Sequence, residues 1–142
     1  MVEISWNEGI TWSAELETGY INIDGQHRTL FKLVSDLIEL CQREEKIEIN
    51  KTLMFLVNYA TEHFADEEYI ARIYKYPQFE KHKKMHEDFT KTVGVFVEHY
   101  ERNGDSEVLS SVVNKLIISW IINHIRNEDS KIAEHIKKLE RR

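Results

Sequence analysis

Seven residues of this chain combine residue types and spacings that suit a pair of metal ions. They are five histidines and two carboxylates: His27, His63, Glu67, His82, His86, His124 and Asp129. Two pairs, His63 with Glu67 and His82 with His86, are four residues apart, so each pair lies on one helix face and aims at a common point. Imidazole and carboxylate without thiolate suit iron, zinc, copper or manganese, so the donor set leaves the element open.

The alternative for any one of these histidines is an ordinary core residue held by hydrogen bonds, which is more common than a metal ligand. The neighbours of the paired histidines argue against that reading. His63 lies beside Ala60 and Phe64, and His82 and His86 fall in line with apolar positions. An unpaired buried polar ring costs roughly 1 to 3 kcal/mol, so five inward imidazoles need a common partner. A metal site satisfies all of them at once.

The donor count predicts that the site is not closed. Two six-coordinate ions that share both carboxylates and one solvent oxygen keep one coordination position open, which is typical of a site that binds a small ligand. His82 and His86 share a helix and therefore an ion, and His124 is the natural third ligand. We expect His27 and His63 on the ion with the open position.

Four amphipathic helices must hold these residues, because one proline and five glycines leave few breaks in the chain. Apolar positions recur at helical spacing between the expected boundaries. These boundaries are Asp24 to about Arg43 for the first helix, an N-cap at Asn50 for the second, Tyr76-Pro77 between the second and third, Asn103-Gly104 after the third, and Asp105 or Ser106 as the N-cap of the fourth. The pattern predicts an all-α fold, an antiparallel up-and-down four-helix bundle with functional side chains in its core.

Composition fits this picture. The 142 residues, 42% of them hydrophobic, predict a single domain over 1–142, with an extended N-terminal arm over 1–23 whose Trp6, Trp12 and Tyr20 pack on the bundle 24–142. No secretory segment or uninterrupted apolar run of membrane-spanning length is expected, which places the protein in the cytoplasm without a membrane partner. A net charge of -6 argues against nucleic acid.

Four segments of the chain resemble the hemerythrin-like family, and within it the single-domain bacteriohemerythrins. The segments are 18–31 (TGYINIDGQHRTLF), 63–68 (HFADEE), 76–89 (YPQFEKHKKMHEDF) and 120–129 (WIINHIRNED). The resemblance implies two non-haem iron ions (Fe²⁺/Fe³⁺) with a bridging oxo or hydroxo group, joined by Glu67 and Asp129. It also implies reversible binding of O2 at the iron held by His27 and His63, in a pocket lined by Leu30, Phe64, Trp120 and Ile122.

The choice of Asp129 over Glu128 rests on this resemblance. On an ideal helix the residue aligned with His124 is Glu128, one turn on, whereas Asp129 sits about 140° round from it. A local distortion of the helix would reconcile the two, because bulges of that kind are frequent at functional sites.

The expected function is O2 storage, transport or delivery by a non-enzymatic monomer, with an oxygen-consuming enzyme as a partner. The alternatives are a module that senses oxygen or iron, or a di-iron enzyme acting on peroxide or nitric oxide. Three other residues are weaker candidates for a functional role. His99 and His135 are expected at the surface, and Cys41 is expected to be a small buried hydrophobic residue. Ala71, smaller than the apolar residue expected there, would open a channel to the site if it faces the core.

Overall fold

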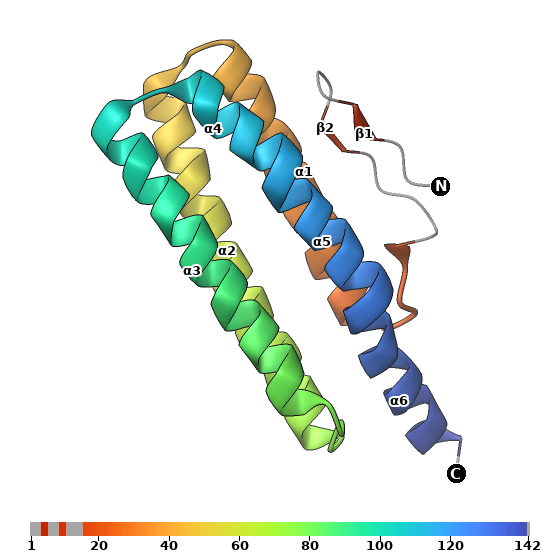
Figure 1. The fold of residues 1–142 in the computed structure, drawn as a ribbon. Helices are drawn as coiled ribbons and strands as arrows, with labels where there is room; N and C mark the ends of the chain where they lie inside the picture. The colour runs from red at the N-terminus through yellow and green to blue at the C-terminus, as the bar shows by residue number, and fades with distance from the viewer. Residues whose placement is uncertain (1–3, 6–8, 11–15, 142) are drawn as a thin grey trace.

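The computed structural model describes residues 4–5, 9–10 and 16–141, and four long helical stretches run antiparallel through it (Figure 1). The first three are α1 (Ile21–Gln42), α2 (Lys46–Ile73) and α3 (Phe79–Asn103). The fourth joins α4 (Ser106–Val112), η2 (Val113–Ile117), α5 (Ile118–His124), η3 (Ile125–Asp129) and α6 (Ser130–Glu140), where η2 and η3 are π-helical turns. The predicted up-and-down four-helix bundle is confirmed.

The start of α1 differs from the prediction that Asp24 is its N-cap. The helix begins three residues earlier, at Ile21. The Asp24 carboxylate reaches back out of the first turn and accepts hydrogen bonds from Thr18 N, Thr18 Oγ1 and Gly19 N, at 2.8, 2.8 and 3.0 Å. Asp24 therefore fixes the chain that enters the helix, and its negative charge lies near the positive end of the helix dipole.

The other helix ends are set by short local signals. The prediction of Asn50 as the second N-cap was wrong, because α2 already begins at Lys46. Asp105 caps α4 as predicted, and its side chain accepts from the backbone N–H groups of Glu107 and Val108. At the end of α3, Gly104 has a φ of 62°, a left-handed conformation that glycine adopts without strain.

The N-terminal arm contains a small hairpin, which the sequence did not predict. Strand β1 (Ile4–Ser5) pairs antiparallel with β2 (Gly9–Ile10), beside the α1 and α5 half of the bundle (Figure 1). Leu16 is buried in the main core cluster and Tyr20 is half-buried against a second one. Trp6 and Trp12 lie outside the described residues.

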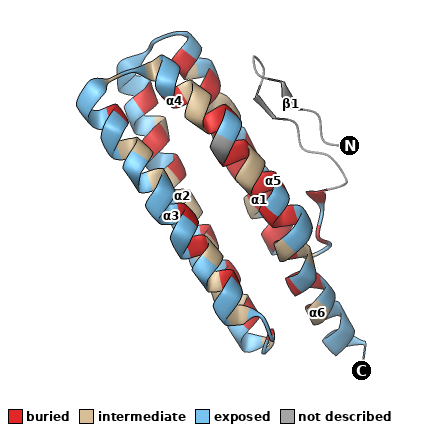
Figure 2. Ribbon diagram, viewed as in Figure 1, coloured by how far each residue is buried: buried red, intermediate tan, exposed pale blue. Residues whose placement is uncertain are grey.

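Buried side chains follow the inward faces of all four stretches (Figure 2). A large apolar cluster fills one part of the bundle, and a smaller one, built on Ala71, Tyr76, Ile132 and Ile136, fills the other end. Cys41 belongs to the large cluster as predicted, and burial raises the pKa of its thiol to about 11. Such a thiol stays protonated and inert at neutral pH.

The fourth stretch, Ser106–Glu140, is long and apolar enough by length and composition to cross a membrane, with a mean hydropathy of 1.4 over an 18-residue window. More than half of that window, 53%, is buried inside the bundle. Packing against the other helices therefore accounts for its apolar character.

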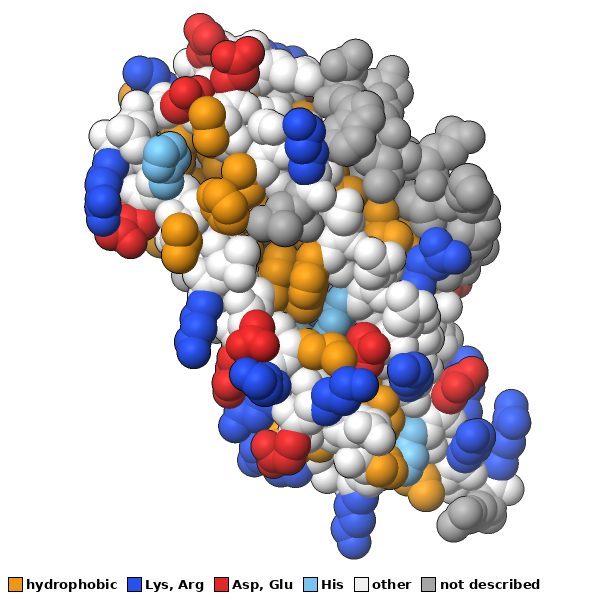
Figure 3. All heavy atoms as spheres, in the orientation of Figure 1, with side chains coloured by type: hydrophobic (Ala, Val, Ile, Leu, Met, Phe, Trp, Pro, Cys, Tyr) orange, Lys and Arg blue, Asp and Glu red, His pale blue; other side chains and the backbone are white. Residues whose placement is uncertain are grey.

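On the face shown in Figure 3, acidic and basic side chains are interspersed.

Candidate metal centre

All seven residues singled out from the sequence come together in the interior of the bundle. His27 is on α1, His63 and Glu67 are on α2, His82 and His86 on α3, His124 ends α5 and Asp129 ends η3. None of them is more than 6% exposed. Each helical stretch thus contributes at least one polar side chain to a place in the bundle that apolar core residues surround.

Glu67 lies at the centre of the cluster, and its two oxygens face different histidines. Oε1 is 2.5 Å from His82 Nε2 and 3.2 Å from His86 Nε2. Oε2 is 3.3 Å from His63 Nε2 and 3.7 Å from His27 Nε2. The carboxylate therefore stands between one group of histidines from α3 and another from α1 and α2.

Asp129 divides its oxygens in the same way. Oδ1 is 3.2 Å from His82 Nε2 and 3.0 Å from His124 Nε2, whereas Oδ2 is 3.0 Å from His27 Nε2. Two overlapping sets of ligand atoms result, with all atoms of a set within 4.8 Å of one another. One set has three histidines (82, 86 and 124), the other has two (27 and 63), and both include Glu67 and Asp129.

The spacing within the three-histidine group suits a single ion. His124 Nε2 is 3.0 Å from His86 Nε2 and 3.2 Å from His82 Nε2. Two nitrogens bound at right angles about 2.1 Å from one ion would lie about 3.0 Å apart. The nitrogens therefore already have the separation of neighbouring ligands on one metal.

A π-helical turn places Asp129 in this cluster. In η3 the chain winds more widely than in an α-helix, so a residue five positions after His124 returns to the same face. Asp129 is 1% exposed, whereas the Glu128 side chain is 21% exposed and lies 3.8 Å from Lys131 Nζ. The distortion that would reconcile the helix wheel with Asp129 is therefore present.

The electrostatics of the cluster favour charged groups despite burial. Burial opposes protonation of His82 and His27, but the Asp129 and Glu67 carboxylates outweigh it and raise the pKa values to about 10 and about 9. Burial likewise disfavours the charged form of Glu67, but four contacting histidines hold the pKa of this carboxyl well below its usual range. The cluster thus pairs positively charged imidazoles with negatively charged carboxylates.

The donor set fits metal ions better than it fits a hydrogen-bonded core. Among the described residues, buried Glu67 Oε2, Asp129 Oδ1 and His82 Nδ1 find no hydrogen-bond partner. Buried polar atoms without a hydrogen bond are costly, and two ring nitrogens that face each other at 3.0 to 3.2 Å can share at most one proton, whereas a metal ion satisfies both. Imidazole nitrogens and carboxylate oxygens are suitable ligands for a first-row transition metal.

Two further side chains, which no pattern in the sequence singled out, hold the histidines from outside. His86 Nδ1 lies 2.9 Å from Glu68 Oε2, and His63 Nδ1 lies 2.6 Å from Gln26 Oε1. Each of the two is the chain neighbour of a member of the cluster, Glu67 or His27. That adjacency is the only signal in the sequence, because both contacts join different helices.

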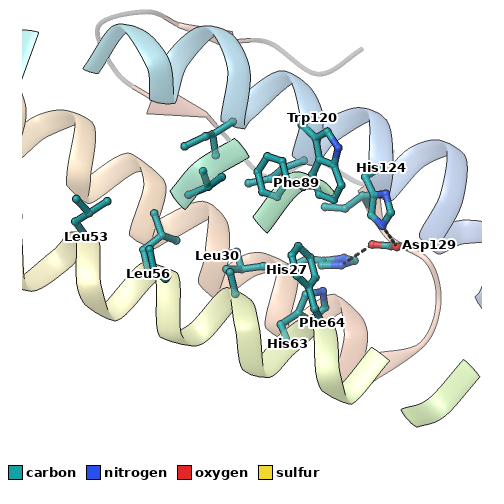
Figure 4. Close-up of a pocket in the computed structure, with 16 residues that line it drawn as sticks. His27, Leu30, Leu53, Leu56, His63, Phe64, Phe89, Trp120, His124 and Asp129 are labelled. Atoms are coloured by element: carbon teal, nitrogen blue, oxygen red, sulfur yellow. Dashed lines mark ion pairs between the residues drawn. The ribbon is translucent and has the colours of Figure 1, made fainter. Parts of the chain in front are cut away.

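An apolar cavity of about 60 Å³ adjoins the two-histidine side of the cluster (Figure 4). His27, His63, His124 and Asp129 are its polar lining residues. Apolar side chains complete it, among them Leu30, Phe64 and Trp120, three of the four residues expected in the O2 pocket. Trp120 also stacks on His124, with ring centroids 4.3 Å apart.

Ile122, the fourth residue expected in the O2 pocket, is not among the residues that line this cavity. Ile122 is buried, but Ile117, Ile121 and Ile125 occupy the lining from this stretch. A residue two positions before His124 lies about 200° round the helix from it, on the far face. Ala71 is also buried without lining the cavity, because it packs in the second cluster.

The two remaining histidines have no place in the cluster. His99 is exposed, as expected. His135 was expected at the surface but is half-buried, and its Nε2 donates to the carbonyl oxygen of Tyr74 at 2.7 Å.

Comparison with known proteins agrees with this arrangement. A model of the hemerythrin HHE cation binding domain matches residues 18–136. Bacteriohemerythrin of Pseudomonas aeruginosa is 29% identical over 128 residues, covering 90% of this chain and 82% of its own. Myohemerythrin of Theromyzon tessulatum is 30% identical over 124 residues, covering 87% and 91%.

Solved structures of hemerythrin have the same fold as this chain. A crystal structure of wild-type hemerythrin superposes with a TM-score of 0.79 at 28% identity, covering 89% of this chain and 96% of that chain. The match to the family model extends over all four helical stretches, from the approach to α1 into α6. The chain therefore belongs to the hemerythrin family.

Proposed function

We propose that this protein binds dioxygen reversibly at a non-haem di-iron centre and serves in O2 storage, transport or delivery in the cytoplasm. The observation that carries the proposal is the unequal division of the histidines around two shared carboxylates. His82, His86 and His124 would hold one iron and His27 with His63 the other, while Glu67 and Asp129 would bridge them. Both histidines of the side with fewer ligands line the apolar cavity, whereas His124 is the one lining residue among the other three histidines.

Iron is proposed from the family together with the donor set. The cluster contains nitrogen and oxygen donors, and Cys41, the only cysteine, is in the apolar core. When bound, two adjacent ferrous ions with an oxo or hydroxo bridge would supply the two electrons that dioxygen takes up on binding. Such a centre needs a position open to a diatomic ligand and closed to bulk water.

The residues of this chain provide both conditions. His27 and His63 border the cavity, so a small apolar ligand that enters it meets the side with fewer ligands. Leu30, Phe64 and Trp120 form an apolar wall there, which disfavours water. Dryness at this point slows irreversible oxidation and so makes release of the ligand possible.

The lining of the cavity also supports a binding protein over an enzyme. Its described polar members are His27, His63, His124 and Asp129, all assigned here to metal ligation. An enzyme acting on peroxide would need a further acid or base within hydrogen-bond reach of the reacting atoms. The lining offers none beyond the ligands themselves.

Metal analysis and a gas-exchange experiment test the proposal. We expect about two irons per chain and, after anaerobic reduction, an absorption band in the visible that appears with O2 and disappears when O2 is removed. His63→Ala should abolish the band, whereas the exposed His99→Ala should leave it unchanged. A wild-type protein without the reversible band would contradict the proposal, and steady turnover of peroxide or nitric oxide with a reductant would favour an enzyme.

A further inference from the structure

The His63 side of the cluster is held by a relay of two side chains that runs to the surface. His63 Nδ1 lies 2.6 Å from Gln26 Oε1, across the α1–α2 interface. Gln26 Nε2 in turn donates to Asp66 Oδ2 at 2.9 Å. The relay therefore connects a 2% exposed imidazole to an exposed carboxylate through a half-buried amide.

Donor and acceptor chemistry fixes the direction of every bond in this relay. An ionised Asp66 can only accept, so it must face the NH₂ group of Gln26. The Gln26 oxygen then faces His63, and because this oxygen can only accept, His63 must carry its proton on Nδ1. The lone pair of His63 is thereby left on Nε2, the atom that lies 3.3 Å from Glu67 Oε2.

The corresponding contact on the other side of the cluster has a different charge. His86 Nδ1 lies 2.9 Å from Glu68 Oε2, and the Glu68 side chain is 20% exposed. An imidazole that donates to a carboxylate becomes a more basic ligand than one that donates to a neutral amide. One histidine of the three-histidine group thus has an anionic partner, while His63 has a neutral one.

We propose that Gln26, held by Asp66, is a positioning residue that keeps His63 in the metal-binding tautomer. Because Gln26 is neutral, it leaves His63 a weaker electron donor to a metal ion than His86. The inference rests on the proposed function, because it concerns how that centre is tuned. A weaker donor stabilises the oxidised ion less than a stronger donor does. Gln26 would therefore favour the reduced, ligand-ready state on the side that borders the cavity.

An exchange of the two side chains tests the tuning with no change in net charge. In the double variant Gln26→Glu/Asp66→Asn, the carboxylate faces His63 and the amide of residue 66 can donate to it, so the number of hydrogen bonds is kept. We expect the iron content to be unchanged and the oxidised state to be favoured about tenfold, a fall of about 59 mV in the midpoint potential. A midpoint potential equal to that of the wild type would overturn the tuning.

The reciprocal variant on the other side is Glu68→Gln, which should raise the midpoint potential. Glu62→Gln serves as the control for charge alone, since Glu62 is an exposed residue on the same helix. A shift of similar size in Glu62→Gln would show a long-range charge effect and overturn the attribution of the Glu68→Gln shift to the contact with His86.

Gln26→Leu tests the holding role separately. It removes the acceptor of the His63 proton at similar volume, so the affinity for the ion that His27 and His63 would hold should fall about 10- to 100-fold. Chelator competition with Zn²⁺ measures this loss without any O2 chemistry, after circular dichroism has confirmed the helical fold. An unchanged Zn²⁺ affinity overturns the positioning role, whereas absence of the O2 band in the wild type would overturn the proposed function alone.

Discussion

Asp129 Oδ1 lies 3.0 Å from His124 Nε2, although five residues separate the two along the chain. The π-helical turn Ile125–Asp129 brings them to one face, where a regular α-helix would present Glu128 instead. A wider turn of this kind forgoes regular helical hydrogen bonding. Its position between two members of the metal cluster gives a reason for its presence.

Asp129→Ala should therefore remove metal binding, whereas Glu128→Ala should not. Asp129 contacts histidines of both groups, so its loss should reduce the iron content from about two to one or fewer per chain. The ion pair of Glu128 with Lys131 is distant, at 3.8 Å, and is worth less than about 1 kcal/mol. Elemental analysis of both variants decides the matter, and metal loss in Glu128→Ala alone would show that the assignment is reversed.

The metal-free protein should lose stability as the pH rises from about 6 to 9. The pKa of His82 is raised from 6.5 to about 10 and that of His27 to about 9, so their contribution is complete below pH 6.5 and is lost towards pH 9 to 10. We expect the free energy of unfolding in urea to fall by about 1 to 3 kcal/mol between these pH values.

Acid should destabilise the metal-free protein as well, because the pKa of Glu67 is held well below 4.5 and that of Asp129 is also lowered. Their contribution is present above the ordinary carboxyl range and is lost as the pH falls. The metal-loaded protein supplies the control, since metal binding needs neutral imidazoles and removes the loss at high pH. Equal urea stability of the metal-free protein at pH 6 and 9 would contradict the prediction made for His82 and His27.

Leu30 should control how long the reduced, ligand-bound protein survives. It is 5% exposed and lines the cavity beside His27 and His63. Leu30→Asn provides a polar partner for water, so autoxidation, followed as decay of the visible band, should accelerate about tenfold. Leu30→Met keeps the wall apolar at similar volume and should leave the rate close to that of the wild type. Equal autoxidation rates in the two variants would contradict the role of Leu30 in excluding water.

Asp24 should matter for stability even though it takes no part in the metal cluster. The residue is 5% exposed, and its carboxylate accepts three hydrogen bonds from Thr18 and Gly19. Asp24→Ala leaves these donors without their partner and should cost about 2 to 3 kcal/mol in urea unfolding. Asp36→Ala, which removes only the surface pair with Lys32, should cost less than about 1 kcal/mol. Similar losses in the two variants would contradict the role of Asp24.

Local signals in the sequence predicted the helices well but misplaced two of their starts. Gly104 and Asp105 act within one turn, so the boundary between α3 and α4 follows from the residues beside it. Asp24 and Asn50 are equally good cap residues by type, yet both lie inside helices. Asp24 instead accepts from Thr18 and Gly19 before the helix, and no rule for single residues distinguishes these uses.

The sequence by itself determined the four helices and six of the seven polar residues on their inward stripes, because periodicity and spacing are properties of a local segment. The family, and with it Asp129, came from the resemblance of four segments to the hemerythrin-like proteins. Only the tertiary structure decided which carboxylate oxygen faces which histidine, that Ile121 rather than Ile122 lines the cavity, and that Gln26 and Glu68 hold opposite sides of the cluster. These contacts join different helices or depend on a π-helical turn. They are therefore set by how the helices rotate and pack against one another, which no local pattern specifies.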